Sequence, residues 1–373
     1  MFGAPHGNCC SAVKDGLDAD VLPREIEPST GETLTMLQGF WYLAVLGSRI
    51  RPGRTRAMTL AGQDMLLGRR TDGAVFAVGD SCPHRGMPMR HGGFDGDCLR
   101  CCYHGWVFRS SDGVCTEIPS VVEAQTTDPS KFRLRTWPCR EVQGNIWVYV
   151  GQGEPGPLPT VPGFEDAAPQ VATTMRFPCN VDVAVMGFID PGHPAFVHTS
   201  RWWKSKPSTS LRHKQKHFEP HELGFRMARH HLKHGANPYR LLGRNVHIDI
   251  SIQLPGIRVE HIEGDSHAAC VLAAATPISE TETDVHYCVY WTPKWLAPFR
   301  PAAAWMARDF LDQDRVVAVR LMENESPPSY LFVGDPDTQV RWWHRLKREY
   351  LASAAEGRAF VNPLRAQTLE WRS

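Results

Sequence analysis

Short apolar runs recur through the first part of the chain at intervals of about ten residues, as in small β domains. WYLAVLG begins at Trp41, and MLLGRR and AVFAVGD follow it, each separated from the next by Gly, Asp or Arg. The pattern continues to NIWVYVG at 145–151, and Ser110, Asp112 and Gly113 form a hairpin-type turn on the way. We therefore predict a small all-β domain over 38–151, preceded by an arm at 1–37 that lacks this pattern.

A stretch rich in Pro and Gly, GQGEPGPLPTVPGFED, then interrupts the alternation. Proline is excluded from central strands and helix interiors, so we place a linker at 152–165. Beyond it, HIDISIQL, RVEHIE, AACVLAAAT and VHYCVYW predict an antiparallel sheet, and helical patterns follow at 299–324 and 338–352. The expected fold class is α+β, with a second domain at 166–373 made of an antiparallel sheet and helices.

Composition and charge exclude several classes of protein. The 373 residues include 41 Lys and Arg against 40 Asp and Glu, a formal net charge of +1. This balance offers no long-range field to a polyanion, so no nucleic acid partner is expected. No apolar stretch is long enough for a membrane span, and the N-terminal segment lacks the features of a secretion signal. We therefore expect a cytoplasmic protein whose 11 cysteines are reduced thiols.

Two pairs of cysteine and histidine lie close together in SCPHRGMPMRHGGFDGDCLRCCYHGW. Cys82 and His84 are separated by one residue, and Cys101 and His104 by two, so each pair can form one side of a four-ligand metal site. A structural zinc site with two Cys and two His would use the same atoms. One sulfur and one imidazole in each pair instead favour a [2Fe-2S] cluster in which one iron has two thiolates and the other two imidazoles.

These segments resemble the two sequence boxes of the Rieske family, with Cys-Pro-His-Arg-Gly at 82–86 and Cys-x-Tyr-His-Gly-Trp at 101–106. The resemblance implies that the all-β domain binds a Rieske [2Fe-2S] cluster through Cys82, His84, Cys101 and His104. Cys102 departs from the family pattern, which commonly has proline there. We interpret Cys98 and Cys102 as packing residues.

A second group of candidate ligands lies in FIDPGHPAFVHTSRWW, which contains Asp190, His193 and His198. On an ideal helix the two histidines would point about 140° apart. The Pro and Gly residues at 191–194 argue against such a helix, so the imidazoles can converge only across a broken or widened turn. Taken alone, the segment is explained equally well as a surface loop with two histidines beside an acidic residue.

The spacing Asp-x-x-His-x-x-x-x-His downstream of a cluster motif resembles the catalytic domain of Rieske non-haem iron oxygenases. The resemblance covers residues 40–325. It implies a mononuclear non-haem Fe(II) ion that is held by His193, His198 and a carboxylate further along the chain. Such a triad leaves positions open at which the metal can bind dioxygen next to a substrate.

The carboxylate is expected in AAAWMARDFLDQDRVVAVRLMEN, which offers Asp309, Asp312 and Asp314. Asp314 lies in an apolar stripe, where an unpaired carboxylate is costly unless a metal or another partner satisfies it. Asp312 has charged neighbours and is expected in solvent. The family pattern, an acidic stretch followed by Val-Val, also points to Asp314, which we predict as the third ligand.

Asp190 is interpreted as a bridge and not as a ligand. In the family, an aspartate at this position links the Rieske histidine of one subunit to the iron histidine of its neighbour, which implies a homotrimer. Asp190 could equally cap a helix that begins at Pro191. The surroundings depart from the family pattern, because Met-Gly at 186–187 replaces an acidic residue and Asn, and Val-Asp at 181–182 replaces Trp-Lys.

The resemblance implies the terminal oxygenase component of a Rieske system, which oxidises a small-molecule substrate with O2. No glycine-rich dinucleotide loop is found, so NAD(P)H would act through a separate ferredoxin or flavin reductase. We favour monooxygenation, by hydroxylation or oxidative demethylation, over ring cis-dihydroxylation, because the chain is shorter than typical large dioxygenase subunits. A non-catalytic Rieske electron-transfer protein and a zinc-structured binding protein are the alternatives from other classes.

Three further features allow more than one interpretation. The segment 212–235 carries six histidines among basic residues and is either a docking surface for an acidic ferredoxin or, as we favour, a solvated flap or loop over the active site. Trp202 and Trp203 are expected to pack in the core, with the pocket or a subunit contact as alternatives. Residues 241–243 and 271–275 suggest a pocket for a bulky apolar or aromatic substrate.

Overall fold

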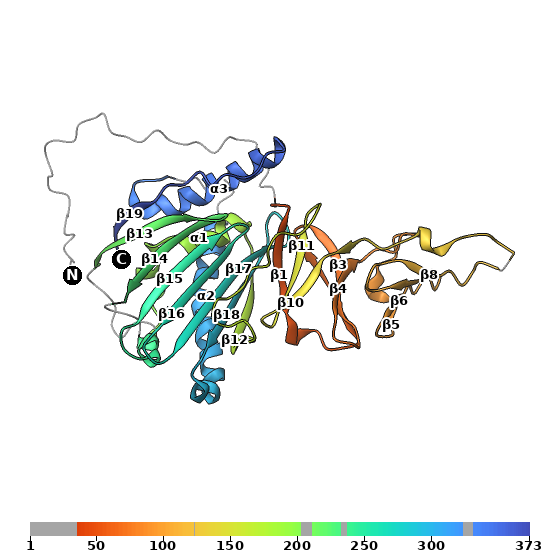
Figure 1. Ribbon diagram of the computed structural model, residues 1–373, viewed down its shortest axis with the longest axis horizontal. Coiled ribbons are helices and arrows are strands. Elements are labelled where there is room, and N and C mark those ends of the chain that lie inside the picture. The colour runs from red at the N-terminus through yellow and green to blue at the C-terminus, as the bar shows by residue number, and fades with distance from the viewer. Residues whose placement is uncertain (1–35, 123, 203–210, 233–236, 324–330) are drawn as a thin grey trace, which may run out of the picture.

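The computed structural model describes residues 36–122, 124–202, 211–232, 237–323 and 331–373, and it has two parts joined end to end (Figure 1). The first part carries three small antiparallel sheets, and the second a single large antiparallel sheet with α-helices. The arm predicted at 1–37 lies almost wholly outside the described residues. Within the described part of the chain, no helix is long and apolar enough to cross a membrane.

The strand orders of the first part are β1-β11-β10, β2-β3-β4-β9 and β5-β6-β7-β8. The strands are β1 (Phe40–Leu46), β2 (Arg54–Leu60), β3 (Gln63–Arg69), β4 (Val75–Gly79), β5 (Gly93–Phe94), β6 (Cys98–Arg100), β7 (Val107–Arg109), β8 (Cys115–Glu117), β9 (Thr136–Trp137), β10 (Cys139–Val142) and β11 (Asn145–Val150). The short strands predicted from the apolar runs are therefore present.

The large sheet has eight strands in the order β12-β18-β17-β16-β15-β14-β13-β19. The strands are β12 (Val171–Phe177), β13 (His213–His221), β14 (Gly224–His231), β15 (His247–Gln253), β16 (Ile257–Glu263), β17 (Ala268–Pro277), β18 (Thr283–Trp291) and β19 (Gln367–Arg372). The helices are α1 (Val181–Ile189), α2 (Arg300–Leu321) and α3 (Thr338–Ala355). In Figure 1, α1 and α2 lie behind this sheet, and α3 runs along its upper edge.

The burial pattern of each element follows from what covers it. Strands β1 and β11 are buried along their whole length, and both are apolar in sequence. Strand β16 is only partly buried, with Ile257, Glu260 and Ile262 as its buried residues. On α2 the buried residues recur three or four positions apart, so they form one stripe that faces the sheet: Ala307, Leu311, Asp314 and Ala318.

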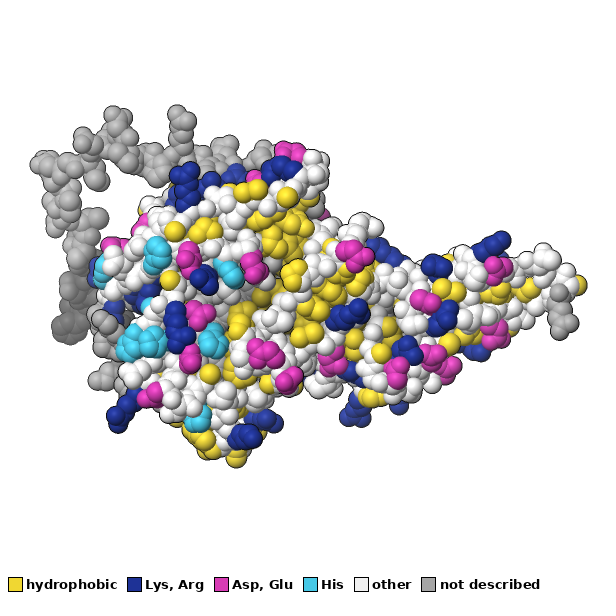
Figure 2. All heavy atoms as spheres, viewed as in Figure 1, with side chains coloured by type: hydrophobic (Ala, Val, Ile, Leu, Met, Phe, Trp, Pro, Cys, Tyr) yellow, Lys and Arg dark blue, Asp and Glu magenta, His cyan; other side chains and the backbone are white. Residues whose placement is uncertain are grey.

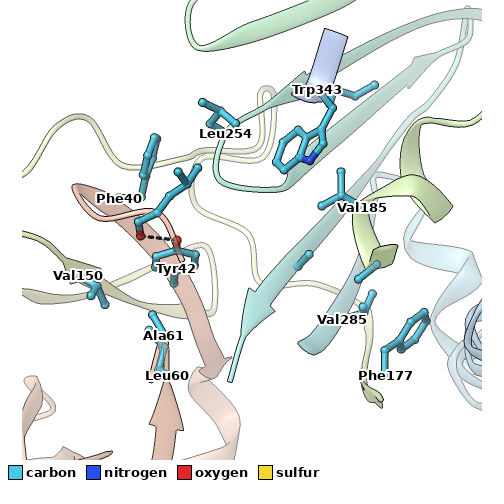
Figure 3. Close-up of a cluster of buried hydrophobic side chains, with 14 of the residues drawn as sticks. Phe40, Tyr42, Leu60, Ala61, Val150, Phe177, Val185, Leu254, Val285 and Trp343 are labelled. Atoms are coloured by element: carbon cyan, nitrogen blue, oxygen red, sulfur yellow. Dashed lines mark hydrogen bonds between the residues drawn. The ribbon is translucent and has the colours of Figure 1, made fainter. Parts of the chain in front are cut away.

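One hydrophobic core joins the two parts of the molecule. Figure 3 shows Phe40 and Tyr42 of β1, Val185 of α1 and Trp343 of α3, which belong to one cluster of buried side chains that includes residues of both parts. The Tyr42 hydroxyl donates to the carbonyl of Leu37 at 2.7 Å. The large sheet and its helices are therefore anchored to the small sheets by apolar packing, which fixes how the two parts are placed.

The histidine-rich segment differs from its prediction. Residues 212–235 were expected as a flap or loop, but β13 and β14 within this range are strands of the large sheet. Figure 2 shows histidine side chains among both acidic and basic side chains on the visible face. Within the segment, His213 lies 3.1 Å from Glu370 and Arg226 lies 2.6 Å from Glu219, so its surface lacks the uniform positive charge that docking of an acidic protein would use. His234 lies outside the described residues.

Candidate metal centres

Two loops with the same backbone hydrogen bonds carry the four predicted cluster ligands. In the first loop, the N–H of Cys82 donates to the carbonyl of Met87 at 2.9 Å, and the N–H of Gly86 donates to the carbonyl of Cys82 at 2.8 Å. The second loop repeats both bonds, at 2.9 and 3.1 Å, with Cys101, Trp106 and Gly105. Each loop turns at its glycine, with φ of 72° at Gly86 and 74° at Gly105, a conformation that favours glycine.

The side chains of these loops converge. Cys82 and Cys101 are both buried, and burial, reinforced by the neighbouring Cys101, raises the pKa of the Cys82 thiol to about 11. The rings of His84 and His104 lie 4.5 Å apart, and His84 stacks on Trp106 at 4.7 Å. The buried Nδ1 of His84 has no hydrogen-bond partner among the described residues. Two adjacent thiols and an unsatisfied imidazole nitrogen fit a metal cluster better than they fit plain packing.

The second site is a triangle of side-chain atoms from two distant segments. The Nε2 atoms of His193 and His198 are 3.3 Å apart, and Asp314 Oδ1 lies 3.5 Å from the first and 3.4 Å from the second. One ion with bonds of about 2.1 Å and angles of about 90–120° would hold its ligand atoms about 3.0–3.6 Å apart. The three residues therefore fit a single metal ion, as the sequence predicted for their positions.

The histidines converge across a broken helix. Helix α1 ends at Ile189, and a separate single turn of 3-10 helix spans His193–Ala195. The alternative role of Asp190, capping a helix that begins at Pro191, therefore does not hold, because Asp190 lies at the C-terminal end of α1 and the next helical turn begins at His193. Its carboxylate still accepts N–H groups beyond the helix, from Gly192 at 2.7 Å and from His193 at 3.4 Å.

Asp190 also orients the first histidine through its backbone. The Nδ1–H of His193 donates to the carbonyl of Asp190 at 2.8 Å, which leaves Nε2 directed at the triangle. The bond fixes the tautomer in which Nε2 carries a lone pair and can bind a metal. Asp190 thus lies beside the predicted ligands and contributes no atom to the triangle.

Helix α2 positions both the third ligand and the ring of His198. Phe310, one turn before Asp314, stacks on the His198 imidazole with centroids 3.7 Å apart and an interplanar angle of 15°. His198 is 1% and Asp314 9% exposed. Because His198 is buried, the alternative interpretation of the segment as a surface loop with two histidines does not hold for His198.

Asp309 and Gln313 of α2 bind the segment that follows His198. Asp309 accepts from Ser200 Oγ at 2.5 Å and from Trp202 Nε1 at 2.8 Å. Gln313 accepts from the backbone N–H of Thr199 at 3.0 Å. These contacts were not predicted, although Asp309 and Gln313 are one helical turn apart and so share a face beside that of Phe310 and Asp314. Asp309 therefore holds the segment after His198 in place. Trp202 donates a hydrogen bond to Asp309, so it does more than pack in the core as predicted.

The other acidic candidate and the other cysteines are placed as follows. Asp312 pairs with Arg315 at 2.8 Å on the half-exposed side of α2, in agreement with its predicted exposure. Cys98 is partly buried, but Cys102 is exposed, so its interpretation as a packing residue is wrong. Trp203 lies outside the described residues.

Burial dominates the electrostatics of the triangle. It raises the pKa of Asp314 to about 8, while the charge of Arg258 acts in the opposite direction. Burial also lowers the pKa of His193. Burial therefore favours the neutral forms of the Asp314 carboxyl group and the His193 imidazole, and an ion bound there would supply the charge that stabilises the carboxylate.

Two cavities meet at the triangle. A hollow of about 510 Å3 between α1 and α2 is lined by Gly187, His193 and Asp314, and one of about 710 Å3 on the sheet side is lined by Gly187, His193 and His198. Both volumes include space open to solvent. Residues 241–243 and 271–275 line neither of these two cavities. Strand β17, which contains 271–275, has its side chains packed in the core instead.

Comparisons with known proteins agree with this geometry. A Rieske [2Fe-2S] domain model matches residues 40–138. The chain is 35% identical over 155 residues to 4beta-methylsterol monooxygenase of Methylococcus capsulatus, a match that covers 41% of each chain. It aligns with less than half of the length of each of the first curated relatives it matches.

Solved structures extend the similarity over most of the fold. Dicamba monooxygenase bound to dicamba superposes with a TM-score of 0.67 at 20% identity, covering 85% of this chain and 98% of the other. The oxygenase in a reduced complex with ferredoxin from carbazole 1,9a-dioxygenase gives 0.64 at 18% identity, covering 88% and 94%. The Rieske domain and the predicted fold class, a small all-β domain followed by an antiparallel sheet with helices, are confirmed.

Proposed function

We propose that this chain, which carries a Rieske [2Fe-2S] domain and has the fold of Rieske oxygenases, is the terminal oxygenase component of a Rieske non-haem iron system. The observation that carries the proposal is the triangle of His193, His198 and Asp314 at the wall of two cavities. Two imidazoles and one carboxylate on one side of an ion leave the other side open to O2 and substrate. A Rieske electron carrier has no use for such a second site.

The cofactors divide the chemistry between the two sites. When bound, a [2Fe-2S] cluster at Cys82, His84, Cys101 and His104 supplies single electrons, and Fe(II) at His193, His198 and Asp314 supplies the site of dioxygen activation. The protein residues hold and shield these groups. Asp190 fixes the tautomer of His193, Phe310 covers one face of the His198 ring, and burial of Asp314 keeps bulk water from the carboxylate.

The placement of the two sites supports a homotrimer. In Figure 1 the small sheet β5–β8, between whose strands the second cluster loop lies, is at the far end of the molecule from α1 and α2. Within one chain the cluster and the triangle are therefore well separated. A ring of three chains would bring the cluster of one subunit to Asp190 of the next, and Asp190 would then connect the two sites.

The electron-transfer partners and the reaction class follow from the proposed oxygenase function. The chain would take electrons from a separate ferredoxin or flavin reductase that oxidises NAD(P)H, and it would act in the cytoplasm on a small apolar or aromatic molecule. We favour monooxygenation, by hydroxylation or demethylation, and the similarity to a methylsterol monooxygenase supports this choice. Ring cis-dihydroxylation is the second candidate, favoured by the likeness to the carbazole dioxygenase component. We also propose that residues 152–165 link a cluster domain at 38–151 to a catalytic domain at 166–373.

Product analysis under 18O2 tests the proposed function. The purified chain, loaded with iron and given a ferredoxin, a reductase and NADH, is incubated with panels of aromatic, methoxylated and steroid compounds. We expect substrate-dependent O2 uptake and either one 18O atom in a hydroxylated product or loss of a methyl group. Two 18O atoms on adjacent ring carbons would indicate dihydroxylation instead. Reduction of the cluster with no uptake above background for any compound would contradict an oxygenase.

A further inference from the structure

Three large aromatic side chains are exposed at the segment that leads into α2. Trp295, Phe299 and Trp305 are 52%, 58% and 60% exposed. The first two lie in a 3-10 segment at Lys294–Phe299, and the third lies in the second turn of α2. Single exposed apolar residues are ordinary on a protein surface, but three large rings this close in sequence indicate a contact surface. We call residues 294–308 the aromatic tip.

The aromatic tip projects from the body of the protein. Along 294–302 every residue except Leu296 is exposed. From Arg300, α2 runs inward to Asp314 of the metal triangle, about 21 Å along the helix axis. In Figure 1 the end of α2 that lies away from α1 is the lowest point of the second part, and Figure 2 shows hydrophobic side chains with basic ones beside them at that end. No residue of the tip lines either cavity at the triangle, so the tip is separate from that site.

The charged residues of the aromatic tip all have the same sign. The tip contains Lys294, Arg300 and Arg308, and the chain has no acidic residue between Asp284 and Asp309. Within the part of the chain that the structure describes, none of these three basic side chains forms an ion pair with a carboxylate. The chain as a whole has a formal net charge of only +1, so the tip is a local concentration of positive charge.

Exposed aromatic rings among basic side chains match the chemistry of a lipid surface. Tryptophan is favoured at the level of the headgroups, where its ring meets the acyl chains and its N–H group stays hydrated. Lysine and arginine are attracted to anionic lipids, and their long apolar stems let the charged group reach the phosphates. The aromatic tip offers both kinds of side chain within one short segment.

The same features argue against a protein partner. In a symmetric contact with a second copy of this chain, the tip would face itself and bring like charges together. Trp305 lies six residues after Phe299, so the two side chains leave the helix axis about 120° apart. A flat protein surface, even an acidic one, would cover only one of these rings, whereas a layer of lipid headgroups can surround both.

We propose that the aromatic tip docks this protein on an anionic lipid surface. The three aromatic rings lie at the level of the headgroups, and the three basic side chains lie against the lipid phosphates. The contact is peripheral, because the tip rests in the headgroup layer and does not span the bilayer. Helix α2 places the metal triangle about 20 Å from the lipid contact.

Binding of the whole iron-loaded chain to vesicles tests this proposal. Flotation compares vesicles of phosphatidylcholine alone with vesicles that also contain about 30% phosphatidylglycerol. We expect at least about tenfold tighter binding to the anionic vesicles, and about 0.5 M NaCl should remove most of this difference. With brominated phosphatidylcholine in the anionic vesicles, tryptophan fluorescence should fall, because Trp295 and Trp305 would lie within reach of the bromine atoms.

Two double variants separate the aromatic contribution from the charge. Trp295→Ser/Trp305→Ser should weaken binding to anionic vesicles about tenfold and remove the quenching by brominated lipid. Lys294→Gln/Arg300→Gln should weaken binding to anionic vesicles about tenfold and leave binding to neutral vesicles unchanged. All four side chains are exposed, so the midpoint of urea denaturation should not change in either variant.

Matched controls make the same kinds of change elsewhere on the surface. Arg51→Gln/Arg56→Gln removes two exposed positive charges from the first part of the molecule. Val361→Ser replaces another exposed apolar side chain. Neither control should change the affinity for either kind of vesicle.

Several results would overturn the proposal. They are equal binding of the native protein to both kinds of vesicle, and equal weakening of binding by the tip variants and the controls. A change of oligomeric state in the tryptophan variant, with no vesicle binding by the native protein, would show that the tip is a contact between chains. Vesicle binding is measured without turnover, so its outcome does not depend on the proposed oxygenase function.

Discussion

Asp314 Oδ1 lies 3.4 Å from His198 Nε2, although the two residues come from segments far apart in the sequence. Helix α2 makes this contact possible in two ways, because it carries Asp314 and also Phe310, which stacks on the His198 ring. One helical turn separates these two side chains, so the placement of α2 against His198 sets where Asp314 lies in the triangle.

Asp190→Asn should leave metal binding unchanged and slow the delivery of electrons from the cluster. The amide oxygen can still accept the Gly192 N–H that Asp190 accepts at 2.7 Å, so the fold and the iron content should not change. Loss of the charge at a group next to the metal ligands should slow substrate-coupled reoxidation of the cluster by about tenfold to a hundredfold. Stopped-flow absorbance of the reduced protein mixed with O2 and substrate measures this rate. An unchanged rate would show that Asp190 only shapes the turn.

Gly187→Ala should stabilise the protein and narrow the active site. Gly187 lies within α1, where alanine is favoured over glycine by about 1 kcal/mol. The added Cβ would lie 3.8 Å from Cβ and Cγ of Asp314, an ordinary van der Waals contact. We expect the free energy of unfolding to rise by about 0.5–1 kcal/mol. Because Gly187 lines both cavities, the largest substrates should show a raised KM. A fall in stability would mean that the contact with Asp314 is too tight.

Lys347→Met should destabilise the protein strongly. Lys347 Nζ lies 2.7 Å from Asp182 Oδ2, Trp343 Nε1 donates to the other oxygen at 2.9 Å, and all three side chains are buried. Removing the lysine leaves a buried charge without its counter-ion, at a cost of about 3–5 kcal/mol. Asp182→Asn/Lys347→Met should recover most of this loss, since the amide can still accept from Trp343. Urea denaturation of the three proteins gives the comparison, and a double variant no better than the single one would contradict the account.

His286 should make the protein lose stability in acid. Burial lowers the pKa of His286 from 6.5 to about 4, and its Nδ1 lies 3.0 Å from Thr174 Oγ1. The unfolded chain takes up a proton below pH 6.5 while the native histidine stays neutral, so the stabilisation is complete above pH 6.5 and is lost as the pH falls toward 4. Between pH 7 and 4.5 this loss amounts to about 2.5 kcal/mol. His286→Gln, which keeps a partner for Thr174, should show a pH dependence smaller by that amount in urea denaturation. Equal pH dependence of the two proteins would exclude His286 as a cause.

The cluster ligands could be predicted from sequence because each pair lies in one short loop. The backbone bonds that shape these loops join residues four and five positions apart, so their geometry is local. Asp314 could be predicted for a different reason. It stands in the buried stripe of α2, and a carboxylate among apolar residues indicates a function that its neighbours do not supply.

Features that depend on tertiary placement could not be predicted. Helix α1 is apolar nearly all around, so its sequence shows no helical period. Strand β13 is polar enough to resemble a loop, and it is held as a strand by pairing with β14 and β19, the last of which comes from the end of the chain. Arg258 could be assigned to the cavity only after the register of β16 was known, since a shift by one residue would turn it to the other face.

Iron content measured together with the cluster absorbance tests the central claim most directly, that one chain has two separate iron sites. We expect about three irons per chain in the native protein, and about two in His198→Ala and Asp314→Ala, each with the absorption of a Rieske cluster unchanged. Asp312→Asn, on the same helix, should retain about three. Three irons in Asp314→Ala, or loss of the cluster absorption in either alanine variant, would contradict a separate mononuclear site at this triangle.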